Sequence, residues 1–357
     1  MGMEVQSDIK GRIKWEECKM NSKSEQSTGF LRYSMLRSSE IKAPIISITF
    51  LFITFLFIFS ILAVFSPSKV HAAEIDWGQV DAKTIKTFYP GVSSWAFMKG
   101  KDHGTGANVV KKMGKSCADC HVGKDGSFDI KSDQIISGEL KMVASGDALE
   151  PEPLTGMPGF KDISLQAAYD AENIYLRLQW PGSGASTSEE DADRVSIQIA
   201  NKIKSFNLYG CFVSCHDDQS GMPENRGEEK NLYGYFAKGK PQDKLDGYLS
   251  KGQFLDLWEA SFVGTEVKTE DYYVLEDRHE DQNDLTATGS FEGGKYTVVI
   301  TRKLSTGDAK DIKLQDGKRF SIGISIHDNK NKGRKHYVSF PVSIGLSTSG
   351  DVTARKF

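Results

Sequence analysis

The sequence has no excess of basic residues and few cysteines. Its 45 Lys and Arg residues are offset by 48 Asp and Glu residues, which gives a formal net charge of −3. A nucleic-acid-binding domain would need a basic patch, so we expect no nucleic-acid partner. The 5 cysteines are not spread along the chain. Four of them form two close pairs, which argues against a disulfide framework and suggests two tethers for a cofactor.

One long hydrophobic run stands out from an otherwise ordinary composition. Residues 45–65 are 21 residues without a charge, which is long enough to cross a bilayer. Val70-His71-Ala72 then supplies the small residues that a signal peptidase recognises. We therefore predict that residues 1–72 are a signal-peptide region removed on export. The alternative is a membrane anchor at 45–65, and membrane contact is expected only if the signal is uncleaved.

The very start of the chain does not look like part of a signal. Residues 1–34 are mixed in charge and longer than a normal positively charged leader. A conventional signal would begin at Met35. We hypothesise that residues 1–34 result from a start codon assigned too far upstream.

The next segment, 73–133, has few apolar residues and many glycines. About 60 residues of this composition cannot build much of a hydrophobic core. A bound haem would supply the missing apolar mass. We predict that residues 73–133 form a small, loop-rich haem c module.

A CxxCH motif lies in this segment at Cys117, Cys120 and His121. Covalent haem attachment needs two thiols for the vinyl groups and a His that reaches the iron from the same side. Structural zinc would need a second ligand pair of similar spacing, and a redox CxxC would need a thioredoxin-like setting. The chain has neither, so we predict haem c attached at these cysteines, with His121 as an iron ligand.

A second pair, Cys211 and Cys215, is followed directly by His216. The spacing is CxxxCH, one residue longer than the usual motif, and the extra residue can bulge. We predict a second haem c here with His216 as a ligand. A non-covalent haem b at His216, or a strained local disulfide, remains an alternative.

Each iron needs a further axial ligand unless it is catalytic. His103 precedes the first motif by 14 residues among glycines that let the backbone approach a flat macrocycle, and Met113 is its rival. For the second haem we predict His336, which shares a strand face with Val338 and is expected to point at the sandwich core. His327 and His279 are weaker candidates.

From about residue 134 the apolar pattern has a period of two, with Gly- and Asp-rich turns. Residues 165–169 and 174–180 are expected to form a hairpin around the turn 170–173. Further alternating runs lie at 195–199, 296–300, 320–326 and 336–342. This pattern predicts a mainly β domain, an antiparallel β-sandwich over 134–357, preceded by the loop-rich haem c segment.

Four segments together resemble a known family: 168–180, 191–197, 210–216 and 255–258. The family is the haem-binding domain of ethylbenzene dehydrogenase-related proteins, also described as the cytochrome c-552/DMSO reductase-like haem domain. The resemblance covers roughly 134–345, and the segment from Trp95 to His121 resembles the haem c module fused to some members.

The resemblance implies a β-sandwich that holds a haem near one end. Members include γ subunits of periplasmic molybdenum enzymes, whose haem b has Met and Lys ligands, and cytochromes that stand alone. This chain departs from the haem b pattern by its Cys211–His216 motif and by Lys335-His336 near the late Lys position. Met222 and Lys335 are therefore rival ligands to His216 and His336.

We therefore expect a periplasmic or otherwise exported dihaem c-type cytochrome that carries electrons and is not itself an enzyme. Its partners would be redox proteins, such as a molybdenum oxidoreductase or other multihaem cytochromes. One alternative is a γ-like subunit of a periplasmic molybdenum oxidoreductase, such as nitrite oxidoreductase or a dehydrogenase. Others are a haem peroxidase with a five-coordinate iron, and a sandwich that binds a partner or carbohydrate and carries only the first haem.

Overall fold

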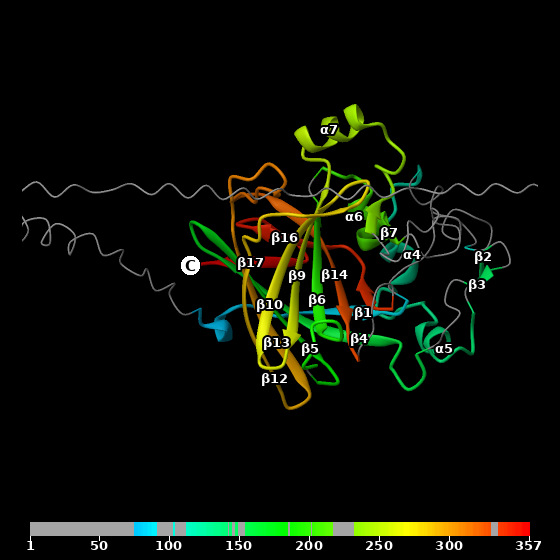
Figure 1. The fold of residues 1–357 in the computed structure, drawn as a ribbon. Helices are drawn as coiled ribbons and strands as arrows, with labels where there is room; N and C mark the ends of the chain where they lie inside the picture. The colour runs from blue at the N-terminus through cyan, green and yellow to red at the C-terminus, as the bar shows by residue number, and fades with distance from the viewer. Residues whose placement is uncertain are drawn as a thin grey trace, which may run out of the picture. The chain divides into compact units, whose positions relative to one another are not determined.

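A computed structural model of the chain describes residues 75–90, 103, 112–141, 143–144, 147–148, 154–184, 186–200, 202–216, 232–329 and 335–357. The predicted signal region, 1–72, lies outside these residues. Residues 74–357 form one compact unit (Figure 1). Within the described ranges, no helix is long and apolar enough to cross a membrane.

The unit is built on one large, curled β-sheet. Its strands follow one another, edge to edge, as β11 (Arg278–Glu280), β10 (Glu266–Val274), β9 (Leu255–Val263), β6 (Asp193–Ala200), β14 (Arg319–His327), β15 (Tyr337–Ser339), β1 (Lys83–Phe88), β4 (Phe160–Tyr169), β5 (Asn173–Pro181), β13 (Lys295–Lys303) and β12 (Thr286–Glu292). Strands β16 (Val342–Leu346) and β17 (Val352–Lys356) bridge β14 and β4. Only the β16–β17 and β17–β4 pairings are parallel among the described strands.

The two halves of this sheet pack face to face around a main core. In Figure 1, strands β6, β9, β10 and β14 run along the view from top to bottom, whereas β1 and β4 run across it. Alternate residues from both halves fill the core, as the period of two predicts, among them Leu176 and Leu178 of β5, Ile197 of β6 and Ile324 of β14. The predicted mainly β, antiparallel sandwich is confirmed.

The predicted hairpin over 165–180 is also confirmed. Strands β4 and β5 pair antiparallel, with Ala167 opposite Leu176. The turn is fixed by the Asp170 carboxylate, which accepts hydrogen bonds from the backbone N–H groups of Glu172 (2.8 Å) and Asn173 (2.7 Å). An Asp side chain that caps its own turn in this way explains why the chain reverses here.

One strand of the sheet comes from the segment expected to be loop-rich. Strand β1 pairs with β15 on one side and β4 on the other. Its inward position Thr87 is fully buried and donates a hydrogen bond of 2.9 Å to the Lys161 carbonyl. Because a threonine fills an inward position, β1 has no apolar alternation that sequence reasoning could detect.

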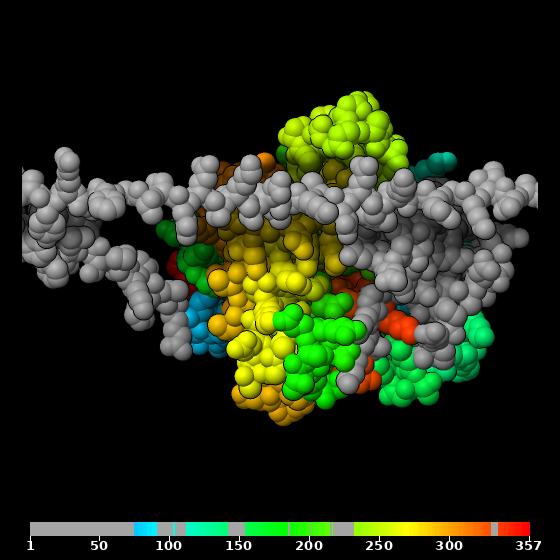
Figure 2. All heavy atoms as spheres, in the orientation of Figure 1, coloured from blue at the N-terminus to red at the C-terminus, as the bar shows by residue number. Residues whose placement is uncertain are grey.

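Short elements complete the unit. They are η1 (Trp77–Gln79), α4 (Ala118–His121), α5 (Ser132–Ile136), β2 (Val143–Ala144), β3 (Asp147–Ala148), α6 (Phe206–Tyr209), η3 (Gly210–Val213), β7 (Ser214–His216), β8 (Leu232–Gly234) and α7 (Gln242–Ser250). Strands β7 and β8 form a separate small sheet. The side chains of α7 form a raised, yellow-green lobe on the surface shown in Figure 2.

A second hydrophobic cluster lies on the face of β6, β9 and β14 that points away from the main core. We call it the outer cluster; its buried members include Phe88, Phe206, Cys211, Phe212, Val213, Leu255, Leu257, Val338 and Phe340. Leu257 belongs to the outer cluster and Trp258 to the main core, as expected for neighbours on one strand. Residues of α4 and of α6–η3 pack onto the outer cluster, and both candidate sites are found there.

Candidate haem sites

A single helical turn, α4, presents the first cysteine motif. Ser116 and Asp119 fix its start: the Ser116 N–H donates to Asp119 Oδ2 (2.6 Å), and the Asp119 N–H donates to Ser116 Oγ (3.3 Å). The hydrogen bonds from Ser116 hold the pKa of the Asp119 carboxyl below its usual value. Since residues i, i+3 and i+4 share one side of a helix, Cys117, Cys120 and His121 lie on the same side.

The His121 ring is oriented by a backbone carbonyl. Its Nδ1 lies 3.0 Å from the Asp129 carbonyl oxygen, which can only accept a hydrogen bond. Nδ1 therefore carries the proton, and Nε2 keeps the lone pair that a metal ion needs. The His103 ring lies almost parallel to the His121 ring, with centres 6.0 Å apart and planes 25° apart. The fold thus brings the two predicted ligands of the first haem next to each other.

Neither thiol of the first motif is in a disulfide. Cys117 is half-buried and Cys120 is exposed. Burial raises the pKa of the Cys117 thiol to about 12. Both sulfurs are therefore free for thioether bonds.

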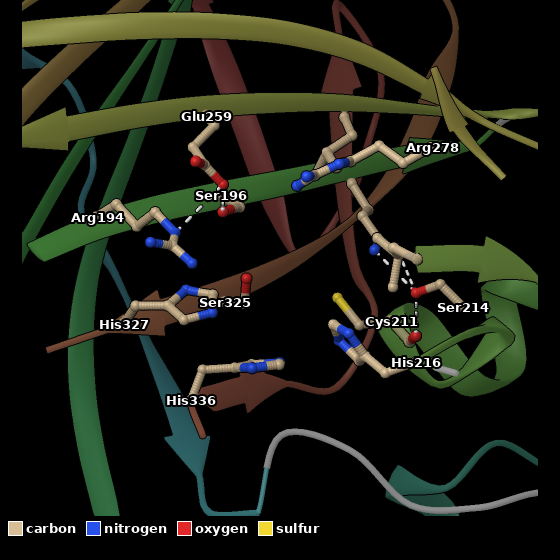
Figure 3. Close-up of a pocket in the computed structure, with 13 residues that line it drawn as sticks. Arg194, Ser196, Cys211, Ser214, His216, Glu259, Arg278, Ser325, His327 and His336 are labelled. Atoms are coloured by element: carbon tan, nitrogen blue, oxygen red, sulfur yellow. Dashed lines mark hydrogen bonds and ion pairs between the residues drawn. The ribbon is translucent and has the colours of Figure 1, made fainter. Parts of the chain in front are cut away.

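The second motif borders a cavity of about 190 Å³ on the outer face of the sheet (Figure 3). Its lining comes from β6, β9, β11 and β14, from η3, β7 and β8, and from the residue before β15. The lining residues are Arg194, Ser196, Gln198, Cys211, Ser214, His216, Leu232, Leu257, Glu259, Arg278, Ser325, His327 and His336. Figure 3 shows three imidazoles directed at this cavity.

Two of these imidazoles have the spacing of the first pair. The ring centres of His216 and His336 are 6.0 Å apart, with planes at 57°. The centres of His327 and His336 are only 4.6 Å apart. A metal–imidazole bond is about 2 Å and the ring nitrogen lies about 1.1 Å from the ring centre, so two imidazoles on opposite sides of one metal have centres roughly 6 Å apart. The His216–His336 pair fits this spacing, whereas the His327–His336 pair is too close.

The position of His336 differs from the expected one in one respect. Sequence alternation placed it toward the sandwich core. His336 instead lines the cavity on the opposite face of the sheet, and Val338 and Phe340 of the same alternation lie in the outer cluster. The alternation of buried residues was predicted correctly. The face that carries His336, Val338 and Phe340 is buried by the outer cluster and not by the main core.

Cys211 is buried at the inner end of the cavity and forms no disulfide. Burial raises the pKa of its thiol to about 12. The sulfur packs against Gly323 of β14, where an added Cβ would lie 2.5 Å from Sγ. The backbone of Cys215 belongs to β7 and pairs with Tyr233; its side chain lies outside the described part of the structure.

Two arginines near the cavity were not anticipated from the sequence. Arg194 Nε lies 3.5 Å from Glu259 Oε2, and Arg278 packs its guanidinium over the Tyr272 ring at 4.8 Å. A guanidinium binds carboxylates well, so either could pair with an acidic group of a ligand in the cavity. Arg194 could have been found, because it alternates with the core residues of β6 and must face the other way.

The two candidate sites share the outer cluster. The backbone N–H of Cys117 donates a hydrogen bond of 3.1 Å to the Leu208 carbonyl, just before the second motif. The Phe340 ring packs nearly parallel to the His121 ring, with centres 6.3 Å apart. Phe340 lies four residues after His336, so one short segment carries residues that belong to both candidate sites.

Of the weaker candidates for iron ligands among the described residues, only His327 lies at one of the two candidate sites. Met113 is 57% exposed. His279 stacks on Tyr273 with ring centres 4.7 Å apart, and it does not line the cavity. His327 lines the cavity beside His336. The sequence had made it a weaker candidate because the other residues on its strand face are small and polar. Met222 lies outside the described residues.

Comparison with known proteins gives the family. The chain matches the protein family described as Ethylbenzene dehydrogenase over residues 76–283 and 261–339. This chain belongs to the ethylbenzene dehydrogenase family. The family match spans both cysteine motifs and both histidine pairs, and it includes β1 and the segment that carries α4.

Two relatives are named as cytochromes. Cytochrome c-552 of Stutzerimonas stutzeri is 35% identical over 309 residues, which are 83% of this chain and 96% of that protein. Cytochrome c-551 of Rhodocyclus tenuis is 30% identical over 287 residues, which are 79% of this chain and 99% of that protein. The chain is therefore a cytochrome c-like member of the ethylbenzene dehydrogenase family.

Solved structures give only a distant likeness. A family 9 carbohydrate-binding module from Caldicellulosiruptor kristjanssonii, in complex with glucose, aligns with a TM-score of 0.27 at 9% identity, over 52% of this chain and 69% of that one. The same kind of module in complex with cellotriose aligns with a TM-score of 0.28 at 8% identity, over 57% of this chain and 79% of that one. TM-scores this low support no conclusion about function.

Proposed function

We propose that this member of the ethylbenzene dehydrogenase family is an exported dihaem c-type cytochrome that transfers electrons between redox partners. One observation carries the proposal: two imidazole pairs have ring centres 6.0 Å apart, and each pair adjoins a cysteine motif. This separation is roughly what one iron between two imidazoles requires.

A first haem would be held by thioethers to Cys117 and Cys120, with His121 as an iron ligand. The hydrogen bond from His121 Nδ1 to the Asp129 carbonyl, 3.0 Å long, keeps Nε2 available and fixes the ring plane. His103 would be the second iron ligand. The donor set and the 6.0 Å separation of the two ring centres support these assignments.

A second haem would be held by thioethers to Cys211 and Cys215, with His216 and His336 as its iron ligands. The donor set fits a haem, because imidazoles, a free thiol and guanidiniums converge on one cavity. Arg194 and Arg278 would hold the propionates. The ring centre of His327 lies 4.6 Å from that of His336. His327 would therefore pack against the ligand His336 and would not be a ligand itself.

The ligands determine the chemistry. A bound haem supplies one-electron redox chemistry at its iron. Two histidines at each iron would leave no coordination site for a substrate, which favours electron transfer over peroxidase activity. Bis-histidine ligation also lowers the reduction potential relative to Met/His ligation. The outer cluster, which both sites share, would keep the two haems close enough for electrons to pass between them.

A second candidate function is an electron-transfer subunit of a molybdenum oxidoreductase, favoured by the family description itself. The relatives named as cytochromes match over 96% and 99% of their own lengths, which favours a cytochrome that acts by itself. Affinity purification from the native host separates these functions. A stoichiometric large catalytic subunit would support the second candidate, and a lone chain would support the first.

Haem stoichiometry is the direct test of the dihaem proposal. The intact mass of the exported protein should equal the chain from about residue 73 plus two haems, and a pyridine haemochrome assay should give two haems c per chain. A Cys211→Ala/Cys215→Ala variant should keep one covalent haem, as should the matched Cys117→Ala/Cys120→Ala variant. One covalent haem in the parent protein would overturn the proposal for the second motif.

A further inference from the structure

Strand β9 carries different groups on its two faces. Leu257 and Glu259 line the haem cavity, whereas Asp256 and Trp258 point the opposite way, as alternation along a strand requires. On this second face, Asp256 meets two more carboxylates, Asp271 and Asp311. The three side chains each offer an oxygen within 4.8 Å of the others.

These carboxylates come from three separate segments that the fold brings together. Asp256 and Asp271 lie on the neighbouring strands β9 and β10, where Asp271 is directly opposite Trp258. Asp311 follows β13 in the connection to β14. Because each carboxylate belongs to a different segment, anything bound between them would join the β9–β10 pair to this connection.

One cation of the chain already reaches the cluster. Arg302 of β13 lies 2.5 Å (Nη1) from Asp256 Oδ2 and 3.7 Å (Nη1) from Asp311 Oδ1. Its guanidinium also packs over the Trp258 ring at 4.7 Å. With all three carboxyl groups ionised, one guanidinium would leave two negative charges unbalanced.

The remaining carboxylate oxygens have no hydrogen-bond partner. Asp271 is 4% exposed, and both of its carboxylate oxygens are buried without a partner. The same holds for Asp256 Oδ1 and Asp311 Oδ2. Burying a charged group is unfavourable unless it is paired or binds a metal ion. Four buried oxygen atoms without partners, on three converging side chains, therefore point to a bound cation.

We propose that Asp256, Asp271 and Asp311 bind one Ca²⁺ ion. Ca²⁺ takes oxygen ligands at about 2.3–2.6 Å, so oxygens across the ion are up to about 5 Å apart, whereas Mg²⁺ at about 2.0–2.1 Å would need about 4 Å. The three oxygens lie within 4.8 Å of one another, which Ca²⁺ can bridge, and Ca²⁺ accepts irregular oxygen geometry whereas Mg²⁺ demands a near-ideal octahedron. A divalent ion together with Arg302 also balances the three carboxylates. This site is separate from the haem sites and does not rest on the proposed function.

The test uses the haem-loaded protein after treatment with a chelator. Isothermal titration with CaCl₂ should give about one Ca²⁺ per chain, and a hundredfold excess over Kd should raise Tm by about 5 °C relative to EDTA. MgCl₂ at the same concentration should give a smaller rise. Asp271→Asn should lose both the binding heat and the Tm response. Asp243→Asn, which removes the same charge from exposed α7, should behave like the parent protein.

Several outcomes would overturn the site. No binding heat in the parent protein, together with the same Tm in CaCl₂ and EDTA, would mean that Asp271 holds a proton there instead. A Tm response kept in Asp271→Asn would assign Ca²⁺ to another site, such as haem propionates. Asp311→Asn provides a second variant if Asp271→Asn fails to fold. Haem absorbance recorded on the same samples separates loss of Ca²⁺ from loss of haem.

Discussion

The backbone N–H of Cys117 donates a hydrogen bond of 3.1 Å to the carbonyl of Leu208, three residues before Cys211. This bond joins the segments that carry the two cysteine motifs, although the motifs are far apart in sequence. Both segments also pack on the outer cluster. Their relative position is therefore fixed by backbone and by apolar contacts, and electron transfer between the proposed haems depends on it.

Replacing His103 tests the ligand opposite His121. His103→Ala should leave the first iron five-coordinate or bound to water, and so remove roughly half of the low-spin bis-histidine signal. His279→Ala is the matched control, because His279 stacks on Tyr273 and does not line the cavity that His216 and His336 line. Electron paramagnetic resonance of the oxidised protein measures the change. An unchanged spectrum in His103→Ala would give the ligand role to another residue.

Two substitutions distinguish the proposed ligand His336 from its neighbour His327. His336→Ala should remove the low-spin signal of the second haem, because His336 is at the distance from His216 that an iron requires. His327→Ala should leave the iron of the second haem six-coordinate and change only its reduction potential. Visible absorbance with a redox titration distinguishes the two. Equal loss of six-coordination in both variants would contradict the assignment of His336.

Gly323 should tolerate no side chain, because an added Cβ would lie 2.5 Å from Cys211 Sγ. We expect Gly323→Ala to destabilise the fold by about 1–3 kcal/mol, as overpacking does, and to lower the occupancy of the second haem. Gly247→Ala in helix α7 is the control: its Cβ would meet nothing within 4 Å, and alanine should stabilise the helix by about 0.5–1 kcal/mol. Urea unfolding and haem content check both. A neutral Gly323→Ala would show that β14 can move away from Cys211.

A buried carboxylate should make stability depend on pH. Burial and the neighbouring Asp328 carboxylate raise the pKa of Asp193 to about 7, although the Tyr296 hydroxyl donates a 2.5 Å hydrogen bond to it. The folded state then binds a proton that the unfolded state, with a pKa of about 3.9, has released. The stabilising contribution of Asp193 should therefore be lost as pH rises from about 4 to about 7 and change little above that.

Asp193→Asn provides the check on this dependence. The amide keeps an oxygen for Tyr296 but cannot ionise, so the fall in stability between pH 4 and pH 7 should become shallower. Denaturant unfolding at several pH values measures the slope. The same slope in the variant and the parent protein would assign the pH dependence to other groups.

The sequence predicted those parts of the fold that local patterns encode. The alternation in 174–180, 195–199 and 320–326 identified core strands, and Asp170 marked the hairpin turn. Strand β1 could not be predicted, because Thr87 gains its buried partner, the Lys161 carbonyl, only through long-range pairing. Register between distant strands is not visible in a local window.

The cysteine motifs and their histidines could be proposed from the sequence, whereas the other groups around the sites could not. Cysteine spacing gave the two motifs, and among the few histidines His103 and His336 were the favoured partners, with Met113, His327, His279, Met222 and Lys335 left as rivals. The ring centres of His103 and His336 lie 6.0 Å from those of His121 and His216 respectively. The arginines at the cavity and the three carboxylates were not predicted. Each of these groups acquires its role from neighbours on other strands, which composition and spacing do not reveal.

The central place of β1 has a consequence for engineering the chain. It lies between β15 and β4, so deleting Lys83–Phe88 would open the sheet and leave unpaired backbone groups on both neighbours. New edges of this kind invite aggregation. A shortened protein without residues 75–90 should therefore precipitate or swap strands with another copy, even if every cysteine and histidine discussed above were kept.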